Sequence, residues 1–153
     1  MSEAPKDFSV PVGIRWSDLD PNGHVRHSVY YDWGAMVRIT FLDKHGVGIA
    51  WMTRNGIGPV LFREEARFLR ELRFGDDLRM DLQLTAASPD GRKWKMRHRI
   101  FRGEELAATL DLDGAWLDLR ARKVTVPPPE MARAFEAIGR SEDFVELTKP
   151  PSA

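Results

Sequence analysis

The chain has 153 residues, of which 42% are apolar and 30% are charged, a size and composition typical of one globular domain. Its 23 basic and 23 acidic residues cancel, which argues against a protein that works mainly by neutralising nucleic-acid phosphates. The absence of cysteine excludes disulfides, thiolate nucleophiles and cysteine-based metal sites. No signal peptide is visible and no run approaches the roughly 18 apolar residues of a membrane helix, so we expect a cytoplasmic protein without a membrane span.

The first predicted element is a strand at residues 9–16, where apolar residues alternate with polar or turn-forming ones. Pro11 and Gly13 interrupt this strand, which indicates a position at the edge of a sheet. The sequence DLDPNG follows at residues 18–23, and its Asp, Pro, Asn and Gly suit the successive positions of a tight turn. The chain therefore turns sharply after its first strand.

From Ser28 the apolar residues recur at three- and four-residue spacing, which predicts a helix of about four turns that ends near Gly46. Gly34 lies in the middle of this helix, where a glycine costs about 1 kcal/mol relative to alanine. A glycine at such a position indicates that another part of the chain packs unusually close. Glycine, asparagine and proline residues then predict a loop that extends to Pro59.

The rest of the chain is predicted to be mostly strand, beginning with an extended stretch at residues 59–72. Three later segments, separated by turns, alternate apolar with polar residues: 79–86, 93–100 and 105–119. The alternation in the last segment changes parity after Gly114, which is typical of a β-bulge. A short helix near residues 130–140 and a polar tail complete the chain.

This order of elements, with one strand, one long helix and a meander of about four strands, predicts an α+β fold. We expect a single domain over residues 1–153 with its core at about residues 8–125, because no repeat or long linker divides the chain. One helix does not cover both faces of such a sheet. A second copy would cover what is left, so we expect a homo-oligomer.

Lys93, Lys95, Arg97 and Arg99 form a basic stripe on one face of a predicted strand, where they would suit a phosphate group. Arg92 is a further candidate for such a contact. The neighbouring strands carry acidic residues on their polar faces, so cross-strand ion pairing explains the stripe without a ligand. The aromatic residue of this strand lies on the opposite face, which argues against single-stranded nucleic acid as a partner.

Reactive side chains concentrate between the first strand and the helix; they are Trp16, Asp18, Asp20, His24, His27, Tyr30 and Tyr31. Residues 18–23 match the first half of an EF-hand loop, but Val29 stands where the calcium-binding Glu belongs and a strand precedes the loop, so this site is excluded. A transition-metal site is a second interpretation, and the sequence does not show whether its ligands converge. Those ligands would be Asp18, Asp20, His24 and His27.

A third interpretation is acid–base or nucleophilic chemistry by a carboxylate at the start of the helix. The free backbone N–H groups there can polarise a substrate carbonyl, which suits acyl transfer. Because the chain lacks cysteine and a G-x-S-x-G motif, a carboxylate is the best available nucleophile or base. Taken alone, Asp20 is also explained as a turn residue, and His27 as a buried, hydrogen-bonded histidine.

The stretch RWSDLDPNGHVRHSVYY at residues 15–31 resembles the signature of hotdog-fold acyl-CoA thioesterases, roughly D-x-D-x-x-G-x-V-x-H/N-x-x-Y. The most similar groups are the 4-hydroxybenzoyl-CoA thioesterase family and the short-chain acyl-CoA thioesterases of the Tol-Pal neighbourhood. The resemblance covers about residues 8–125. It implies a hotdog fold, in which a curved antiparallel sheet of about five strands wraps around one long central helix.

The resemblance also implies site residues. Asp20 takes the position of the family's catalytic carboxylate, which attacks the thioester carbonyl or activates water, and His27 takes the position that orients substrate or water. The backbone amides after Gly23, near His24 and Val25, would polarise the carbonyl. Asp18 would be a turn and helix-entry residue. Trp16, Tyr30 and Tyr31 would line the substrate pocket.

Two positions depart from the family pattern: Trp16 stands where the short-chain group carries Tyr, and Ala35 stands where many relatives carry Glu. The implied activity is hydrolysis of an acyl-CoA to free acid and coenzyme A by a homodimer or homotetramer. No metal or cofactor would be needed beyond the coenzyme A of the substrate. Two alternatives stay open, a non-catalytic module that binds acyl-CoA or acyl-carrier protein, and a hotdog enoyl-CoA hydratase.

Overall fold

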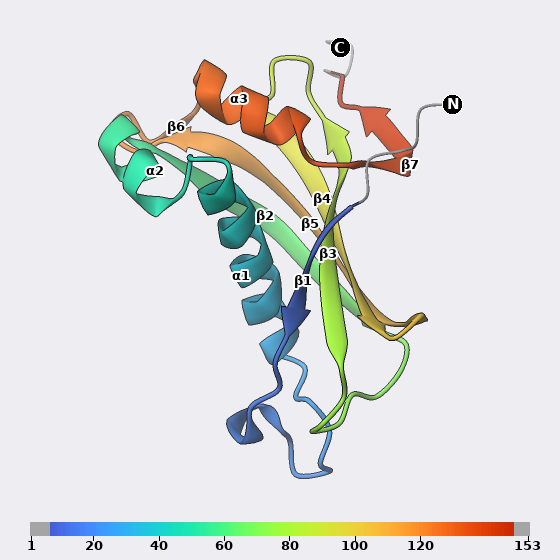
Figure 1. Cartoon of the computed structure of the whole chain (residues 1–153). Coiled ribbons are helices and arrows are strands. Elements are labelled where there is room, and N and C mark those ends of the chain that lie inside the picture. Colours follow the sequence, from blue (N-terminus) through green and yellow to red (C-terminus); the bar gives the residue numbers. More distant parts are fainter. Residues whose placement is uncertain (1–6, 149–153) are drawn as a thin grey trace.

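The computed structural model describes residues 7–148 and shows one curved sheet with a helix across its face (Figure 1). The main path of the sheet has the strand order β1-β3-β4-β5-β2, and each neighbouring pair is antiparallel. The strands of this path are β1 (Phe8–Val12), β2 (Ile57–Phe68), β3 (Leu78–Ala87), β4 (Lys93–Arg102) and β5 (Glu105–Asp118). Two short strands are added, β6 (Lys123–Val124) on β5 and β7 (Arg140–Glu146) parallel to β3.

The described helices are α1 (Val29–Lys44), α2 (Ile49–Asn55) and α3 (Pro129–Glu136), and a 3₁₀ turn η1 (Trp16–Asp18) precedes α1. None of them is long and apolar enough to cross a membrane. Helix α1 buries one stripe at three- and four-residue spacing, which includes Tyr30, Gly34, Val37 and Phe41. This stripe packs on the sheet and forms the core together with the inward-facing residues of β3, β4 and β5.

The α+β class and the edge position of the first strand are confirmed, since β1 ends the main path of the sheet. Helix α3 corresponds to the short helix expected near residues 130–140. A single long central helix is not confirmed, because α2 follows the 16-residue α1. Helix α2 occupies residues predicted to be loop: Gly48 precedes it, and Gly56 ends it in the left-handed conformation at φ 63°. β7 lies in the predicted polar tail, where its pairing with β3 decides its conformation.

The bulge predicted in β5 after Gly114 is wrong, and a bulge lies instead on the neighbouring strand β2. Gly114 pairs with Leu61 and Asp113 pairs with Arg63, so Phe62 of β2 is the unpaired residue. The alternation of β5 does not change face here, because Leu110, Leu112 and Trp116 are all buried, so the expected change of parity is not borne out.

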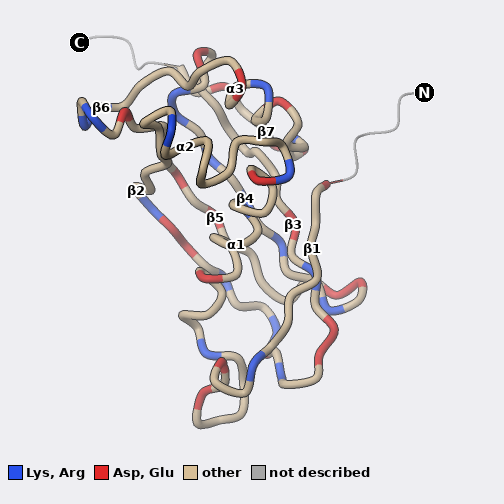
Figure 2. The backbone as a smooth tube through the Cα atoms, turned by 60° about the vertical axis from the view of Figure 1, so that its left-hand side comes forward, with Lys and Arg blue, Asp and Glu red and all other residues tan. Residues whose placement is uncertain are grey.

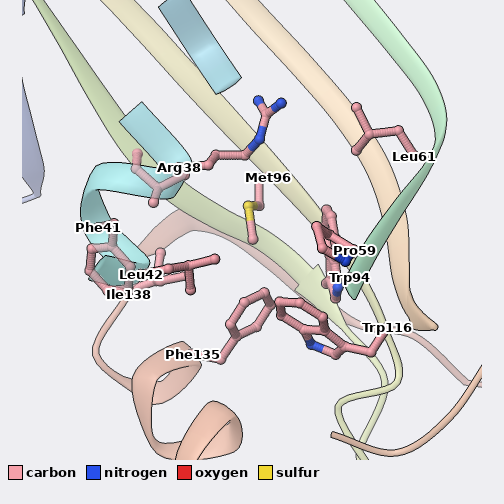
Figure 3. Close-up of a pocket in the computed structure, with 11 residues that line it drawn as sticks. Arg38, Phe41, Leu42, Pro59, Leu61, Trp94, Met96, Trp116, Phe135 and Ile138 are labelled. Atoms are coloured by element: carbon pink, nitrogen blue, oxygen red, sulfur yellow. The ribbon is translucent and has the colours of Figure 1, made fainter. Parts of the chain in front are cut away.

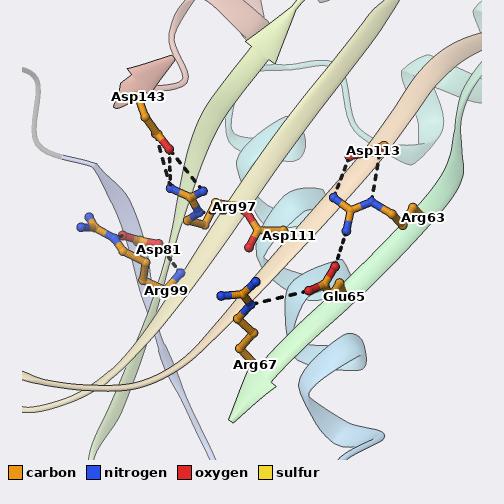
Figure 4. A network of polar contacts seen from close by, with 9 residues as sticks. All are labelled: Arg63, Glu65, Arg67, Asp81, Arg97, Arg99, Asp111, Asp113 and Asp143. Atoms are coloured by element: carbon orange, nitrogen blue, oxygen red, sulfur yellow. Dashed lines mark hydrogen bonds and ion pairs between the residues drawn. The ribbon is translucent and has the colours of Figure 1, made fainter. Parts of the chain in front are cut away.

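The basic stripe of β4 is explained in part by cross-strand pairing (Figure 4). Arg97 donates to Asp111 on β5 at 2.9 Å, and Arg99 donates to Asp81 on β3 at 2.6 Å. Basic and acidic residues are interspersed over the strands and loops of the whole molecule (Figure 2). The Arg97–Asp111 pair is partly exposed, and such pairs typically contribute about 0–1 kcal/mol. In the second pair the Asp81 side chain is buried. Cross-strand pairing is therefore confirmed for these two arginines.

A chain of polar side chains lies between α1 and the sheet. Arg38 donates from Nη1 to Nε2 of His98 at 3.0 Å, and Nδ1 of His98 faces the carbonyl oxygen of Asp81 at 2.7 Å. Because arginine only donates and a carbonyl only accepts, His98 carries its proton on Nδ1 and is neutral. Burial, and then the charge of Arg38, lower the pKa of His98 to about 3. Nη2 of Arg38 also lies 3.5 Å from Glu64 of β2.

Gly34 lies where α1 packs tightly against the sheet. A Cβ atom here would lie 2.6 Å from Cδ2 of Leu110, 3.1 Å from Nη1 of Arg38 and 3.2 Å from Cδ2 of His98. The expectation that the mid-helix glycine marks unusually close packing is confirmed. It also explains why the polar chain fits beneath the helix.

We predict that Gly34→Val destabilises the protein by about 1–3 kcal/mol, since the added methyl groups must displace a packed core. Denaturant unfolding measures the effect. Ala35→Val is the matched control, because Ala35 is exposed on the same helix and its change costs less than about 0.7 kcal/mol in helix propensity. Equal stability losses in both variants would contradict the close contact at Gly34.

A second prediction concerns pH. The pKa of His98 is lower in the folded than in the unfolded chain, so its contribution to stability is full above about 6.5 and is lost as the pH falls toward about 3. His98→Gln keeps a donor and an acceptor but does not titrate. We expect the free energy of unfolding of the wild type to fall more steeply than that of His98→Gln over this range. Parallel curves from urea unfolding would show that His98 is not the titrating group.

Candidate active site

The segment before α1 forms a tight turn closed by Asp20. The backbone N–H of Asp20 donates to the carbonyl of His24 at 2.7 Å, and Gly23 adopts the left-handed conformation at φ 78°. Oδ1 of Asp20 accepts the backbone N–H groups of Asn22 at 2.8 Å and His24 at 3.1 Å. Oδ2 accepts no hydrogen bond from the described residues. One carboxylate oxygen thus shapes the turn and the other stays available.

Asp18 has a different environment. Its side chain is 1% exposed, and it accepts the backbone N–H of Arg15 at 2.8 Å and Nη2 of the same residue at 2.9 Å. These bonds lower the pKa of Asp18. Its backbone carbonyl accepts the N–H of Arg26 at 2.8 Å. Asp18 therefore holds the segment before the helix together, as the sequence interpretation expects.

An open pocket of about 420 Å³ lies at the start of α1. From the predicted site it includes Asp20, His24, Val25, His27 and Tyr30. Its opposite wall is the segment Phe68–Leu72 at the end of β2, which the sequence interpretation missed. Only tertiary pairing brings this wall to the turn: the Val25 N–H donates to the Leu72 carbonyl at 2.8 Å.

Three of the predicted pocket residues lie elsewhere. Trp16 is 83% exposed, and neither it nor Gly23 or Tyr31 lines the pocket. Ala35, the other departure from the family pattern, is exposed on α1. His27 is exposed as well, so its interpretation as a buried histidine is wrong.

Tyr30 is buried in the pocket wall and meets the Phe68 ring edge-on at a centroid distance of 4.9 Å. Burial, and then the negative charge of Asp20, raise the pKa of Tyr30 to about 12. The hydroxyl therefore keeps its proton near neutral pH and is suited to donate a hydrogen bond. It is not suited to act as a base.

The two amides expected to polarise a substrate carbonyl are engaged inside the protein. The His24 N–H donates to Asp20 and the Val25 N–H to Leu72. By contrast, the amides of Tyr30 and Tyr31, in the first turn of α1, have no acceptor within the helix. The amides near His24 and Val25 are thus unavailable, because the turn and the pairing with residues 72–73 use them.

Two of the four residues considered as transition-metal ligands, Asp18 and His24, contact other side chains of the protein. Nε2 of His24 lies 3.1 Å from Glu71, and Arg15 encloses the carboxylate of Asp18. Within residues 7–148 no group of three or more His, Asp or Glu side chains is arranged to hold a metal ion.

The family model of the thioesterase-like superfamily matches residues 14–135. A relative from Ruegeria pomeroyi, an L-carnitine dehydrogenase/betainyl-CoA thioesterase, is 27% identical over 135 residues. That match covers 88% of this chain and 27% of the relative, so this chain spans about a quarter of the relative's length.

Solved structures share the fold. A Staphylococcus aureus protein in complex with CoA superposes with a TM-score of 0.81 at 16% identity, over 99% of this chain and 94% of the other. A 1,4-dihydroxy-2-naphthoyl-CoA thioesterase from Synechocystis gives 0.76 at 18% identity, over 85% and 96%. A Thermus thermophilus thioesterase complexed with coenzyme A and Zn gives 0.69 at 25%, over 84% and 91%. The curved antiparallel sheet is that of the α+β hotdog fold, and the chain belongs to the thioesterase-like superfamily.

Proposed function

We propose that this protein hydrolyses an acyl-CoA thioester to a free acid and coenzyme A. The observation that carries the proposal is the Asp20 carboxylate, whose Oδ1 is held by two backbone amides while the residue lines an open pocket at the start of α1. Membership of the thioesterase-like superfamily and the betainyl-CoA thioesterase activity of a relative support it. Two similar structures contain coenzyme A.

Oδ2 of Asp20 is the reacting atom in this mechanism. As a base, it takes a proton from water while the water oxygen attacks the thioester carbonyl; the C–S bond then breaks and the proton leaves with the thiol. As a nucleophile, it forms a mixed anhydride and releases the thiolate, and water then cleaves the anhydride. Single-turnover hydrolysis in ¹⁸O-water separates these routes. Label enters the side-chain carboxylate of Asp20 only if the anhydride forms.

The first turn of α1 supplies the charge stabilisation. In this mechanism the amides of Tyr30 and Tyr31 and the positive end of the helix dipole would stabilise the negative charge that develops on the carbonyl oxygen. The His27 imidazole, exposed in the pocket, orients substrate or water, and the protonated Tyr30 hydroxyl donates a hydrogen bond. This mechanism uses no metal and no cofactor other than the coenzyme A of the substrate.

The active form is a homodimer or homotetramer. Within the described residues β2 pairs with β5 alone, which leaves its other edge for a further strand. Large apolar side chains are exposed along this edge strand, including Phe62 at 61% and Phe68 at 51%. Because Phe68 also lines the Asp20 pocket, a second copy on this edge would complete the pocket wall.

We expect Asp20→Asn to reduce thiol release from acyl-CoA substrates by at least about a hundredfold, the usual effect of removing an acid–base group. The amide oxygen of Asn still accepts the two turn hydrogen bonds, so the protein stays folded. A panel of short, long and aromatic acyl-CoAs with a thiol reagent measures the rate. Asp32→Asn is the control, because this exposed carboxylate of the first helical turn lies outside the pocket.

Full activity of Asp20→Asn would contradict the role of the carboxylate. If the wild type releases no thiol from any acyl-CoA but still binds one, the protein is a binding module. Hydration of an enoyl-CoA would instead indicate a hydratase.

A further inference from the structure

A second cavity lies at the other end of α1, away from the Asp20 pocket. It has a volume of about 260 Å³ and is enclosed by α1, by the sheet and by α3 with the residues that follow it. Figure 3 shows Arg38 at one end and the rings of Trp116 and Phe135 at the other. Phe135 belongs to α3, so this C-terminal helix closes an otherwise open end of the curved sheet (Figure 1).

The exposed lining residues locate the entrance. Trp94, Trp116 and Phe135 are buried, whereas Pro59 and Leu61 of β2 are exposed, Leu61 at 40%. The cavity therefore opens at the free edge of the sheet and has an aromatic floor.

Two polar groups in the wall lack partners. Nε1 of Trp94 and Nε1 of Trp116 are buried and have no hydrogen-bond acceptor among the described residues. A buried donor without an acceptor destabilises a protein, so such groups are rare in native structures and often have a functional explanation. An acceptor atom on a bound molecule that reaches the nitrogen edge of either indole ring would pair with its N–H group.

The volume limits what fits. A cavity of about 150 Å³ already binds benzene, so 260 Å³ holds a substituted six-membered ring or a branched group of that size. It does not hold a long unbranched fatty chain. Apart from Arg38 at one end, the lining side chains are apolar or aromatic, which favours an apolar group in the interior of the cavity.

We propose that this cavity receives the acyl group of the substrate, and that this group is compact and carries a hydrogen-bond acceptor beyond its carbonyl. The inference rests on the proposed thioester hydrolysis for the identity of the ligand. The thioester carbonyl lies at the entrance between Arg38 and Leu61, and the acyl group points to the indole rings.

Asp20 of the same chain is too far away to act on a compact group in this cavity. Arg38 lies nine residues beyond Val29 on α1, about 13 Å along the helix axis, and the Asp20 pocket adjoins the start of that helix. In the homodimer proposed above, a second copy on the β2 edge would face the entrance. The reacting carboxylate in this cavity's site therefore comes from the partner protomer.

Binding is tested with free acids by calorimetry, which does not depend on turnover. We expect 4-methoxyphenylacetate to bind about three- to tenfold more tightly than 4-ethylphenylacetate, which has the same size but no acceptor, and hexadecanoate not to bind. Leu61→Trp, at the entrance, should weaken binding at least tenfold. Leu119→Trp is the matched control, because Leu119 is 39% exposed and does not line the cavity.

Equal binding of hexadecanoate, or unchanged binding by Leu61→Trp, would overturn the assignment. Equal binding of the two aromatic acids would overturn the need for an acceptor. Phe135→Ala gives a gain of function that an unfolded variant does not show: the preferred acyl chain in the hydrolysis assay should lengthen by two or more carbons. An unchanged preference would exclude the cavity as the acyl site.

Mixing Asp20→Asn with Leu61→Trp tests the shared site. Each variant alone should be nearly inactive. After exchange of protomers, half of the dimers are mixed and each has one intact site, so about a quarter of wild-type activity should return. No recovery, with mixed dimers detected by native mass spectrometry, would contradict a carboxylate supplied by the partner.

The two proposals fail separately. Suppose that the wild type binds the acids, that Leu61→Trp abolishes this binding, and that the wild type hydrolyses no acyl-CoA. This outcome would support the binding cavity and contradict the proposed thioesterase activity. If hydrolysis depends on Asp20 but does not change in Leu61→Trp or Phe135→Ala, the thioesterase activity is supported and the assignment of the cavity as the acyl site is contradicted.

Discussion

The contact between Gly34 of α1 and Leu110 of β5 is the constraint on which the rest of the structure depends. Only a residue without a side chain lets the helix axis come this close to the sheet. The close approach places Arg38 against His98, so two polar side chains satisfy each other in a region that otherwise contains apolar residues. It also fixes both ends of the helix relative to the sheet. The turn with Asp20 lies at one end and the aromatic cavity at the other.

The two aspartates of the turn differ in their hydrogen bonds, and this difference suits one to a structural role and the other to a chemical role. Asp18 is buried and fully engaged by Arg15, so its carboxylate is a structural acceptor. Oδ1 of Asp20 closes the turn by accepting two backbone amides, and the residue also lines the pocket. The interpretations of Asp20 as a turn residue and as a catalytic residue are therefore compatible. The turn holds the carboxylate in one orientation, which is what a reacting group needs.

The C-terminal segment covers part of the concave side of the sheet. A curved sheet with one helix across it leaves an apolar groove beyond the helix, and α3 covers this groove with Phe135 and the residues that follow. β7 then anchors the segment through its pairing with β3. The cavity is thus closed partly by residues far along the chain from the turn with Asp20.

The sequence by itself determined the α+β class, the bounds of α1 within about two residues, the close packing at Gly34 and the position of Asp20 in a turn before the helix. These features depend on periodicity and on turn chemistry, which are local. Tertiary structure alone decided which amides are free, because the N–H of Val25 pairs with Leu72, which is distant in sequence. It also decided that Phe68–Leu72 forms a pocket wall, that the bulge lies at Phe62, and that charged residues of the tail form β7. In each case the partner is far along the chain, and no pattern within a short window reports it.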